Sequence, residues 1–148
     1  MTGGTFDLNR FVTAQAPVFD TVLEELRAGR KRTHWMWFVF PQLRVLGYFP
    51  AARFYGIGSL GEAHAYLAHP LLGPRLILCT QTVLESTAPS LHEIFGSPDD
   101  LKFRSCMTLF DAAASELTPV FAQAVEKWCA GERDPRTRRL IAEPKPVT

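Results

Sequence analysis

The sequence predicts an all-α protein folded as one compact domain. Helix-start and helix-stop residues recur along the whole chain, among them serine and aspartate caps, first-turn prolines and terminal glycines. No segment alternates apolar and polar residues beside a hairpin turn, and the one strand candidate, 36–40, would have no partner. We expect a single multihelical domain over 1–148, with about seven helices in an orthogonal arrangement rather than an up-and-down bundle. Its ordered core would span about 6 to 141, with a frayed tail over 142–148.

Two helices are predicted before residue 30. Asp7 suits the cap of a helix over 8–15, while Pro17 suits the first turn of a second helix that Gly29 ends. The second helix has apolar residues at i, i+3, i+4 and i+7, which are Phe19, Val22, Leu23 and Leu26. Its opposite face is formed by Glu24, Glu25 and Arg27.

The segment 30–43 is the most aromatic part of the chain. Three consecutive basic residues run into His34, which is followed by Trp35, Trp37 and two phenylalanines. Exposing this many rings would create a large apolar patch, so the segment is expected to be buried or to line a concave site. As a helix from Thr33 it would be apolar on every side, which is typical of a deeply buried helix. Pro41 would end or kink it.

The later helices are predicted from cap and proline patterns. Ser59 with Glu62, and Ser90 with Glu93, have the capping-box form, in which the two residues satisfy each other's free backbone amides. The first would open a helix to about residue 68, and the second a short helix that Gly96 ends. Apolar spacing predicts a helix over about 71–85. Three more helices would begin at the pairs Ser97-Pro98, Thr118-Pro119 and Asp134-Pro135.

Composition and charge exclude several classes of protein. The net charge of +1 gives no global field that would attract nucleic acid or an anionic membrane, so any basic site must be local. No apolar run approaches the length of a membrane span. The three cysteines form no C-x-x-C pair, and no histidine spacing suits a metal, so we expect neither a metal nor a cofactor. Without a signal-peptide pattern at the N-terminus, a cytoplasmic protein is expected.

Two regions contain polar residues suited to a ligand. His34 and Gln42 flank the aromatic run, and a buried imidazole or amide needs partners, either within the protein or from a ligand. The start of the helix after Ser97 offers free backbone amides with basic side chains nearby, which favours an anion. The candidate ligand-binding residues are Lys31, His34, Trp35, Trp37, Gln42, Ser97, Lys102 and Arg104. The tryptophans are expected to pack in the core, with lining a pocket as the alternative, and no catalytic residue can be assigned.

Three blocks of this sequence resemble a known family. They are RAGRKRTHWMWFVFPQL at 27–43, YLAHPLLGPRL at 66–76 and EIFGSPDDLKFRSCMTLF at 93–110. They are similar to the bacterial and fungal family called domain of unknown function 1810, which includes a multihelical mycobacterial protein. The resemblance implies an all-α, single-domain, intracellular protein, and it implies no activity or catalytic residues. Some members are labelled calpastatin, a disordered repetitive inhibitor, whereas this chain has enough apolar residues for a full core and no repeats.

Three functions remain open after the sequence is considered. The favoured one is a pocket for a small anionic, nucleotide-like ligand, with or without catalysis, between the aromatic run and the start of the Ser97 helix. The alternative is a non-catalytic interaction module that binds an acidic protein partner through the basic cluster Arg27, Arg30, Lys31 and Arg32. Nucleic-acid binding is the least favoured, because the net charge is close to zero. The oligomeric state is not predicted.

Overall fold

The structure, a computed structural model, describes residues 6–142. Within them the chain forms α-helices, one 3-10 helix and no strand, so the all-α prediction is confirmed. The elements are α1 (Asn9–Gln15), α2 (Phe19–Arg27), α3 (Met36–Val39), η2 (Arg44–Leu46), α4 (Pro50–Phe54), α5 (Leu60–Ala68), α6 (Leu72–Leu84), α7 (Leu91–Phe95), α8 (Asp99–Ala113), α9 (Val120–Trp128) and α10 (Pro135–Ala142). The helix number exceeds about seven because short helices such as α3 and α4 are included. The predicted frayed tail lies outside the described residues from 143 onwards.

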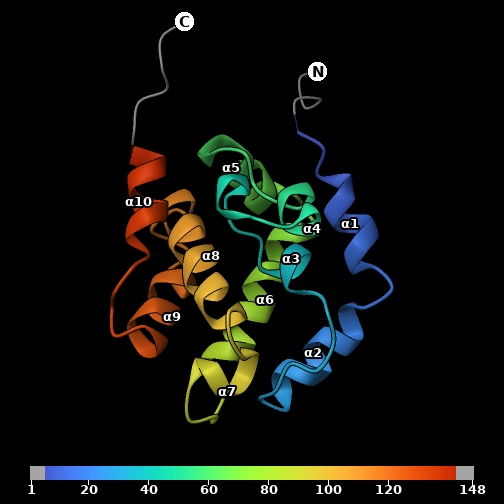
Figure 1. Cartoon of the computed structure of the whole chain (residues 1–148), viewed down its shortest axis with the longest axis vertical. Helices are drawn as coiled ribbons and strands as arrows, with labels where there is room; N and C mark the ends of the chain where they lie inside the picture. The colour runs from blue at the N-terminus through green and yellow to red at the C-terminus, as the bar shows by residue number, and fades with distance from the viewer. Residues whose placement is uncertain (1–5, 143–148) are drawn as a thin grey trace, which may run out of the picture.

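The longer helices surround one core and cross at steep angles (Figure 1). Helices α6, α8 and α9 pack against one another, α5 lies against α6 and α8, and α2 packs on α6. The largest buried side chains include Tyr66, Phe103, Phe110 and Phe121, which come from different helices. This arrangement agrees with the predicted orthogonal packing. None of the described helices is long and apolar enough to cross a membrane.

Glu25 is buried, so its predicted place on the face opposite the apolar residues of the second helix is wrong. Gly29, at φ +74°, ends α2 and turns the chain back over its last turn. There Glu25 Oε1 accepts hydrogen bonds from the amides of Arg32 and Thr33 and from Trp35 Nε1, at 2.7, 3.1 and 3.0 Å. Burial alone would raise the pKa of Glu25, but these hydrogen bonds and that from Thr33 Oγ1 outweigh it and lower the pKa to about 2.

The central helix is much shorter than the helix predicted from Thr33. Only Met36–Val39 is helical, because Glu25 binds the amides of Arg32 and Thr33 and holds the chain out of a helix up to Trp35. The helix ends at Val39, with Phe40 as its C-cap directly before Pro41, which agrees with the prediction that Pro41 would end it. Trp35, Met36 and Phe40 are buried in the core, while Trp37 and Phe38 are half-buried.

The predicted caps divide into two groups. The hydroxyls of Ser59 and Ser90 accept from the amides of Glu62 and Glu93, and Asp134 accepts from the amide of Thr137, as expected for N-caps. The other three caps are wrong: Asp7, Ser97 and Thr118 make no capping bond. Each of their helices begins one residue later than predicted, with Leu8, Pro98 or Pro119 at the cap position, which places the polar side chain too far back. Likewise α2 begins at Phe19, two residues after Pro17.

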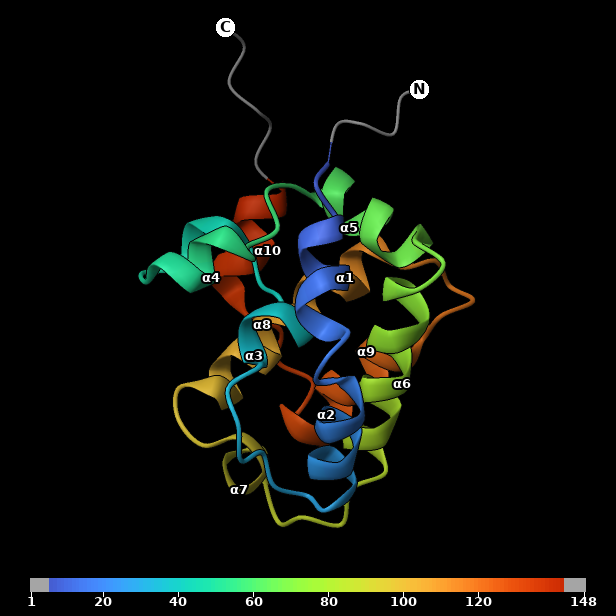
Figure 2. The same ribbon diagram turned by 90° about the vertical axis from the view of Figure 1, so that its right-hand side faces the viewer.

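A loop over residues 44–56, which the sequence patterns did not predict as structured, projects from one side of the molecule with η2 and α4 (Figure 2). Its two ends are joined by an isolated parallel bridge between Leu43 and Ile57. The amide of Arg44 donates to Ile57 O at 2.8 Å, and the amide of Ile57 donates to Gln42 O at 2.9 Å. The ends cross so closely at Gly56 that a Cβ there would lie 2.3 Å from Arg44 Cα. A glycine is therefore required at the base of the loop.

We expect Glu25→Gln to lower the free energy of unfolding at pH 7 by about 1–3 kcal/mol, because a neutral amide replaces a carboxylate that accepts charge-assisted hydrogen bonds. The pKa of Glu25 is lowered on folding, so its contribution to stability is complete above its usual value of 4.5 and is lost as the pH falls towards about 2. Urea unfolding should therefore show a smaller difference between variant and wild type near pH 3 than at pH 7. Exposed Glu24→Gln is the matched control, and an equal difference at both pH values would contradict the assignment.

Candidate functional site

A groove of about 400 Å³ separates the 44–56 loop from α8 and the start of α10. The loop side is mostly apolar and includes Leu46, Tyr48, Phe49 and Ala52. The opposite side is formed by Pro98, Leu101, Lys102 and Ser105, with Asp134 and Arg136 at the α10 end. Gln42, the residue after the buried aromatic run and Pro41, also lines it. The groove therefore lies where the sequence predicts a ligand site, between the end of the aromatic run and the start of α8.

Positive charge is concentrated at one edge of this groove. Lys102 Nζ lies 3.5 Å from Asp99 Oδ1, and Lys31 Nζ lies 3.2 Å from the other oxygen of the same carboxylate. One carboxylate between two ammonium groups leaves a surplus positive charge. The side chain of Arg136 forms no ion pair with any described residue. Asp134 also lines the groove, and it keeps its negative charge because its partners, the amide and hydroxyl of Thr137, are neutral.

The two tryptophans have different environments. Trp35 is buried and donates its Nε1 to Glu25, so it is a core residue. Trp37 is half-buried, and its ring centroid lies 5.8 Å from Lys102 Nζ, a cation–π arrangement that places it behind the groove edge. Its Nε1 is buried without an acceptor from the described part of the protein. Such an orphaned donor costs about 1–3 kcal/mol unless water or a ligand provides an acceptor.

Of the eight predicted site residues, Gln42 and Lys102 line the groove and the other six do not. His34 and Ser97 are exposed at the surface. Arg104 donates to the backbone carbonyls of Glu132 and Arg133, at 2.8 and 2.9 Å, and so connects α8 to the segment before α10. The structure thus brings Gln42, Lys102 and Trp37 together, with Lys31 joined to them through Asp99. Sequence patterns missed Tyr48, Phe49 and Arg136, because nothing in a single sequence relates the 44–56 loop to α10.

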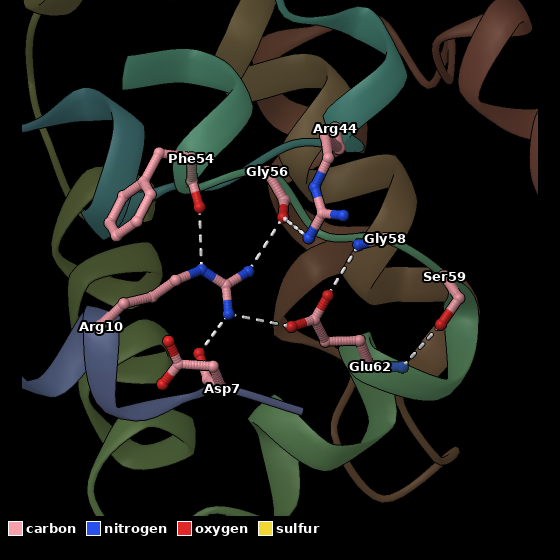
Figure 3. Close-up of polar contacts among 8 residues, drawn as sticks. All are labelled: Asp7, Arg10, Arg44, Phe54, Gly56, Gly58, Ser59 and Glu62. Carbon is pink, nitrogen blue, oxygen red and sulfur yellow. Dashed lines mark hydrogen bonds and ion pairs between the residues drawn. The ribbon is translucent and has the colours of Figure 1, made fainter. Parts of the chain in front are cut away.

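A second hollow, of about 500 Å³, lies on the other side of the 44–56 loop and is floored by a buried ion pair (Figure 3). The side chains of Arg10 and Glu62 are only 6% and 4% exposed, and Arg10 NH1 lies 3.1 Å from Glu62 Oε2. The guanidinium also donates to Phe54 O at 2.9 Å, to Gly56 O at 3.0 Å, and to Asp7 O. The other oxygen of Glu62 accepts from the amide of Gly58 instead of reaching back to Ser59, as a complete capping box would require.

Two further arginines, which take no part in that ion pair, line the second hollow. Arg44 donates to Gly56 O at 3.4 Å, and its guanidinium lies over the backbone of Gly58. Arg53 lines the hollow from α4, next to the exposed ring of Phe54. Neither forms an ion pair with a described residue. Since Arg10 and Glu62 neutralise each other, the hollow has two positive side chains against the carboxylate of Asp7.

The side chains of Cys79 and Cys106 are buried and are not placed for chemistry. Burial raises the pKa of Cys79 to about 12 and that of Cys106 well above its usual value, so neither is a thiolate near neutral pH. The hydroxyls of Ser105 and Thr108 donate to the backbone carbonyls four residues earlier, at 3.2 and 2.8 Å. These groups serve the packing of α8.

The fold and these hollows define an all-helical domain with a projecting aromatic loop and positive charge on both sides of it. Residues 5–141 match the family described as Protein of unknown function (DUF1810), and the chain belongs to this family. It is also similar to a solved structure, that of the conserved hypothetical protein Rv1873 from Mycobacterium tuberculosis. The sequence identity is 57% and the TM-score 0.91, over 94% of this chain and 99% of that one. No curated protein matches the sequence. The family identified from the three sequence blocks is therefore confirmed.

We expect Arg10→Met to lower the free energy of unfolding by about 3–5 kcal/mol, because it leaves the buried carboxylate of Glu62 without its counter-charge. It also removes the Arg10 hydrogen bonds to Phe54 O and Gly56 O at the base of the 44–56 loop, where Gly56 O keeps only the longer bond from Arg44. Chemical denaturation measures the loss, and hydrogen exchange should show faster exchange at the amides of Arg44 and Ile57. Arg53→Met is the matched control, since Arg53 has no such partners. A loss below about 1 kcal/mol in Arg10→Met would show that the pair behaves like an exposed one.

Proposed function

We propose that the groove binds a small organic anion with a flat or apolar body, of the size and character of a nucleotide. The observation that carries this proposal is a mostly apolar groove of about 400 Å³ with Gln42, Lys102 and Arg136 at its edges. Ligand sites in proteins usually combine apolar and aromatic walls with a few convergent polar groups, and their volumes fall in roughly this range, about 300–1,000 Å³. An enzymatic role within this site is left open.

The walls of the groove favour a ligand with a ring. Tyr48 and Phe49 are 85% and 70% exposed, so their faces are available to a planar group. At the other edge, the anionic part of the ligand would contact Lys102 and Arg136, with Gln42 offering a donor and an acceptor. An acceptor on the ligand would also serve the orphaned Nε1 of Trp37 if it reached behind Lys102. These features support an anionic rather than a neutral ligand.

We further infer that the protein works in the cytoplasm. Cys79 and Cys106 are buried free thiols within the core, where they pack as small apolar side chains. Reduced core cysteines suit a compartment in which thiols stay reduced.

A panel of nucleotides and phosphorylated metabolites tests the proposal by thermal unfolding. At a concentration of about ten times its Kd, a ligand that binds the folded protein should add about 1.4 kcal/mol and raise the Tm by several degrees. Lys102→Gln should weaken that ligand about tenfold or more, because it removes a charge-assisted hydrogen bond.

Arg138→Gln is the control for charge, since Arg138 is exposed on α10 and does not line the groove. Equal weakening by both variants would indicate general attraction rather than a site. If no panel member raises the Tm of the wild type, the proposal is wrong.

A second candidate function is an interaction module, and the exposure of Arg27, Arg30 and Arg32 favours it. None of the three forms an ion pair with a described residue, and Arg27 and Arg30 border a hollow of about 270 Å³ beside 86–89. Lys31 differs from its neighbours, because its ammonium is buried against Asp99. An acidic protein partner would therefore contact the three arginines and not Lys31.

The triple variant Arg27→Glu, Arg30→Glu, Arg32→Glu should remove such a partner from a pull-down while the Tm stays within a few degrees of wild type, since surface substitutions usually change stability by less than about 0.5 kcal/mol each. Lys31 is left unchanged in this variant, because its replacement would remove one of the two ion pairs of Asp99. Reversing Arg136, Arg138 and Arg139 gives a matched control on α10. Partners that survive the first triple variant, or that both variants remove, would count against this module.

A further inference from the structure

We propose that the 44–56 loop is a binding ridge for single-stranded nucleic acid, with bases stacked on its exposed aromatic side chains and phosphates in the hollows on its two sides. This extends the proposed function, since the groove would hold one nucleotide unit of a longer ligand.

The charge of the chain is strongly uneven along its length. Between Glu25 and Glu62 there is no aspartate or glutamate, although the segment contains six lysines and arginines. Both flanking acids are buried and bonded within the protein, Glu25 to backbone amides and Trp35, and Glu62 to Arg10 and the amide of Gly58. The net charge of +1 therefore conceals a long acid-free segment, and the projecting loop lies in the second half of that segment.

Three aromatic side chains on this loop face solvent. Tyr48, Phe49 and Phe54 are 85%, 70% and 58% exposed, whereas most aromatic residues of the chain are buried or half-buried. Exposed rings beside cations are the arrangement on which proteins stack unpaired bases, because every base has a flat face. Arg53 directly precedes Phe54 in the chain, and both residues line the second hollow together with Arg44.

Cations lie on both sides of the ring-bearing loop. Arg44 and Arg53 line the second hollow, while Lys102 and Arg136 line the groove. The carboxylates near them are Asp7 in the second hollow and, in the groove, Asp134, which is bonded to Thr137. The surface therefore presents cations, then flat rings, then cations again. A ligand that matches this order has negative groups that alternate with flat rings. Single-stranded nucleic acid has this repeat.

Other ligands account for only part of this surface. A small anion in the groove leaves Phe54, Arg53 and Arg44 without a role, because they lie on the other side of the loop. An acidic peptide supplies the negative charge but few flat rings. A duplex presents phosphates and keeps its base faces stacked inside, so it would contact the cations and not the rings.

Fluorescence anisotropy with fluorescein-labelled oligo(rU) and oligo(dT) of roughly eight nucleotides tests the ridge on the intact protein. We expect single strands to bind roughly tenfold more tightly than a duplex of the same length, because only single strands stack on the rings. With four cations in contact, the logarithm of Kd should rise with the logarithm of salt concentration with a slope of roughly 3.

Phe54→Ala with Arg53→Gln should weaken the single strand roughly tenfold and lower the salt slope by roughly 0.7, since one stacked base and one phosphate contact are removed. Both residues lie outside the groove, so binding of a small anion there should be unchanged. The pair Leu117→Ala with Arg138→Gln is the matched control, because both side chains are exposed away from the two hollows. The Tm of each variant verifies that it is folded.

The outcomes separate this inference from the proposed function. Small anions that bind while the octamer binds no more tightly than a mononucleotide would overturn the ridge and leave the groove intact. An octamer that binds while small anions do not would support the ridge and overturn the groove as a separate site. Equal binding of polyglutamate and the octamer, or no effect of the Phe54 and Arg53 changes, would overturn the ridge.

Discussion

The arrangement of both hollows depends on the buried ion pair between Arg10 and Glu62. Arg10 comes from α1 and Glu62 from α5, and the guanidinium donates to two carbonyls at the end of α4 and the base of the 44–56 loop. A planar guanidinium has enough N–H donors to bond a carboxylate and several carbonyls at once, whereas a lysine ammonium has fewer donors. The same contact therefore joins three parts of the chain and determines how far the loop stands from the core. This loop carries the exposed rings of Tyr48, Phe49 and Phe54.

Glu25, like Glu62, is a buried acid bonded within the protein, and it lies at the other end of the acid-free segment. Its carboxylate is satisfied by amides, a hydroxyl and an indole, without an arginine or lysine. The basic residues that follow α2 are therefore left for other contacts: Lys31 pairs with Asp99, and Arg27, Arg30 and Arg32 stay at the surface. A buried acid that needs no cation leaves a basic surface around it, and this increases the local positive charge of a chain whose net charge is near zero.

The sequence predicted what depends on neighbouring residues. Helices with a clear apolar period or a serine directly before them, such as α5, α6 and α7, begin and end within about one residue of expectation. It failed where distant groups compete for the backbone: Glu25 shortens the helix expected from Thr33. The 44–56 loop depends on Arg10, which lies 44 residues before Phe54, and α4 is too short for a periodic pattern. Of the predicted site residues, Gln42 and Lys102 line the groove, because the segments that follow Pro41 and Pro98 lie close together. His34 lies outside the groove, because Glu25 binds the backbone just before it.

The aromatic residues of this chain divide at Pro41. Before it, Trp35 and Phe40 belong to the core, and their neighbours Trp37 and Phe38 are half-buried against it. After it, Tyr55 packs on Phe11 and Phe38, but Tyr48, Phe49 and Phe54 do not join the core. Moving Phe54 inward would require Arg10 to release the carbonyls of Phe54 and Gly56 and would leave Glu62 buried and unpaired, which costs more than the burial of one ring would return. The ion pair beneath the loop thus keeps Phe54 exposed, and a ring held at the surface in this way is suited to a ligand that covers it.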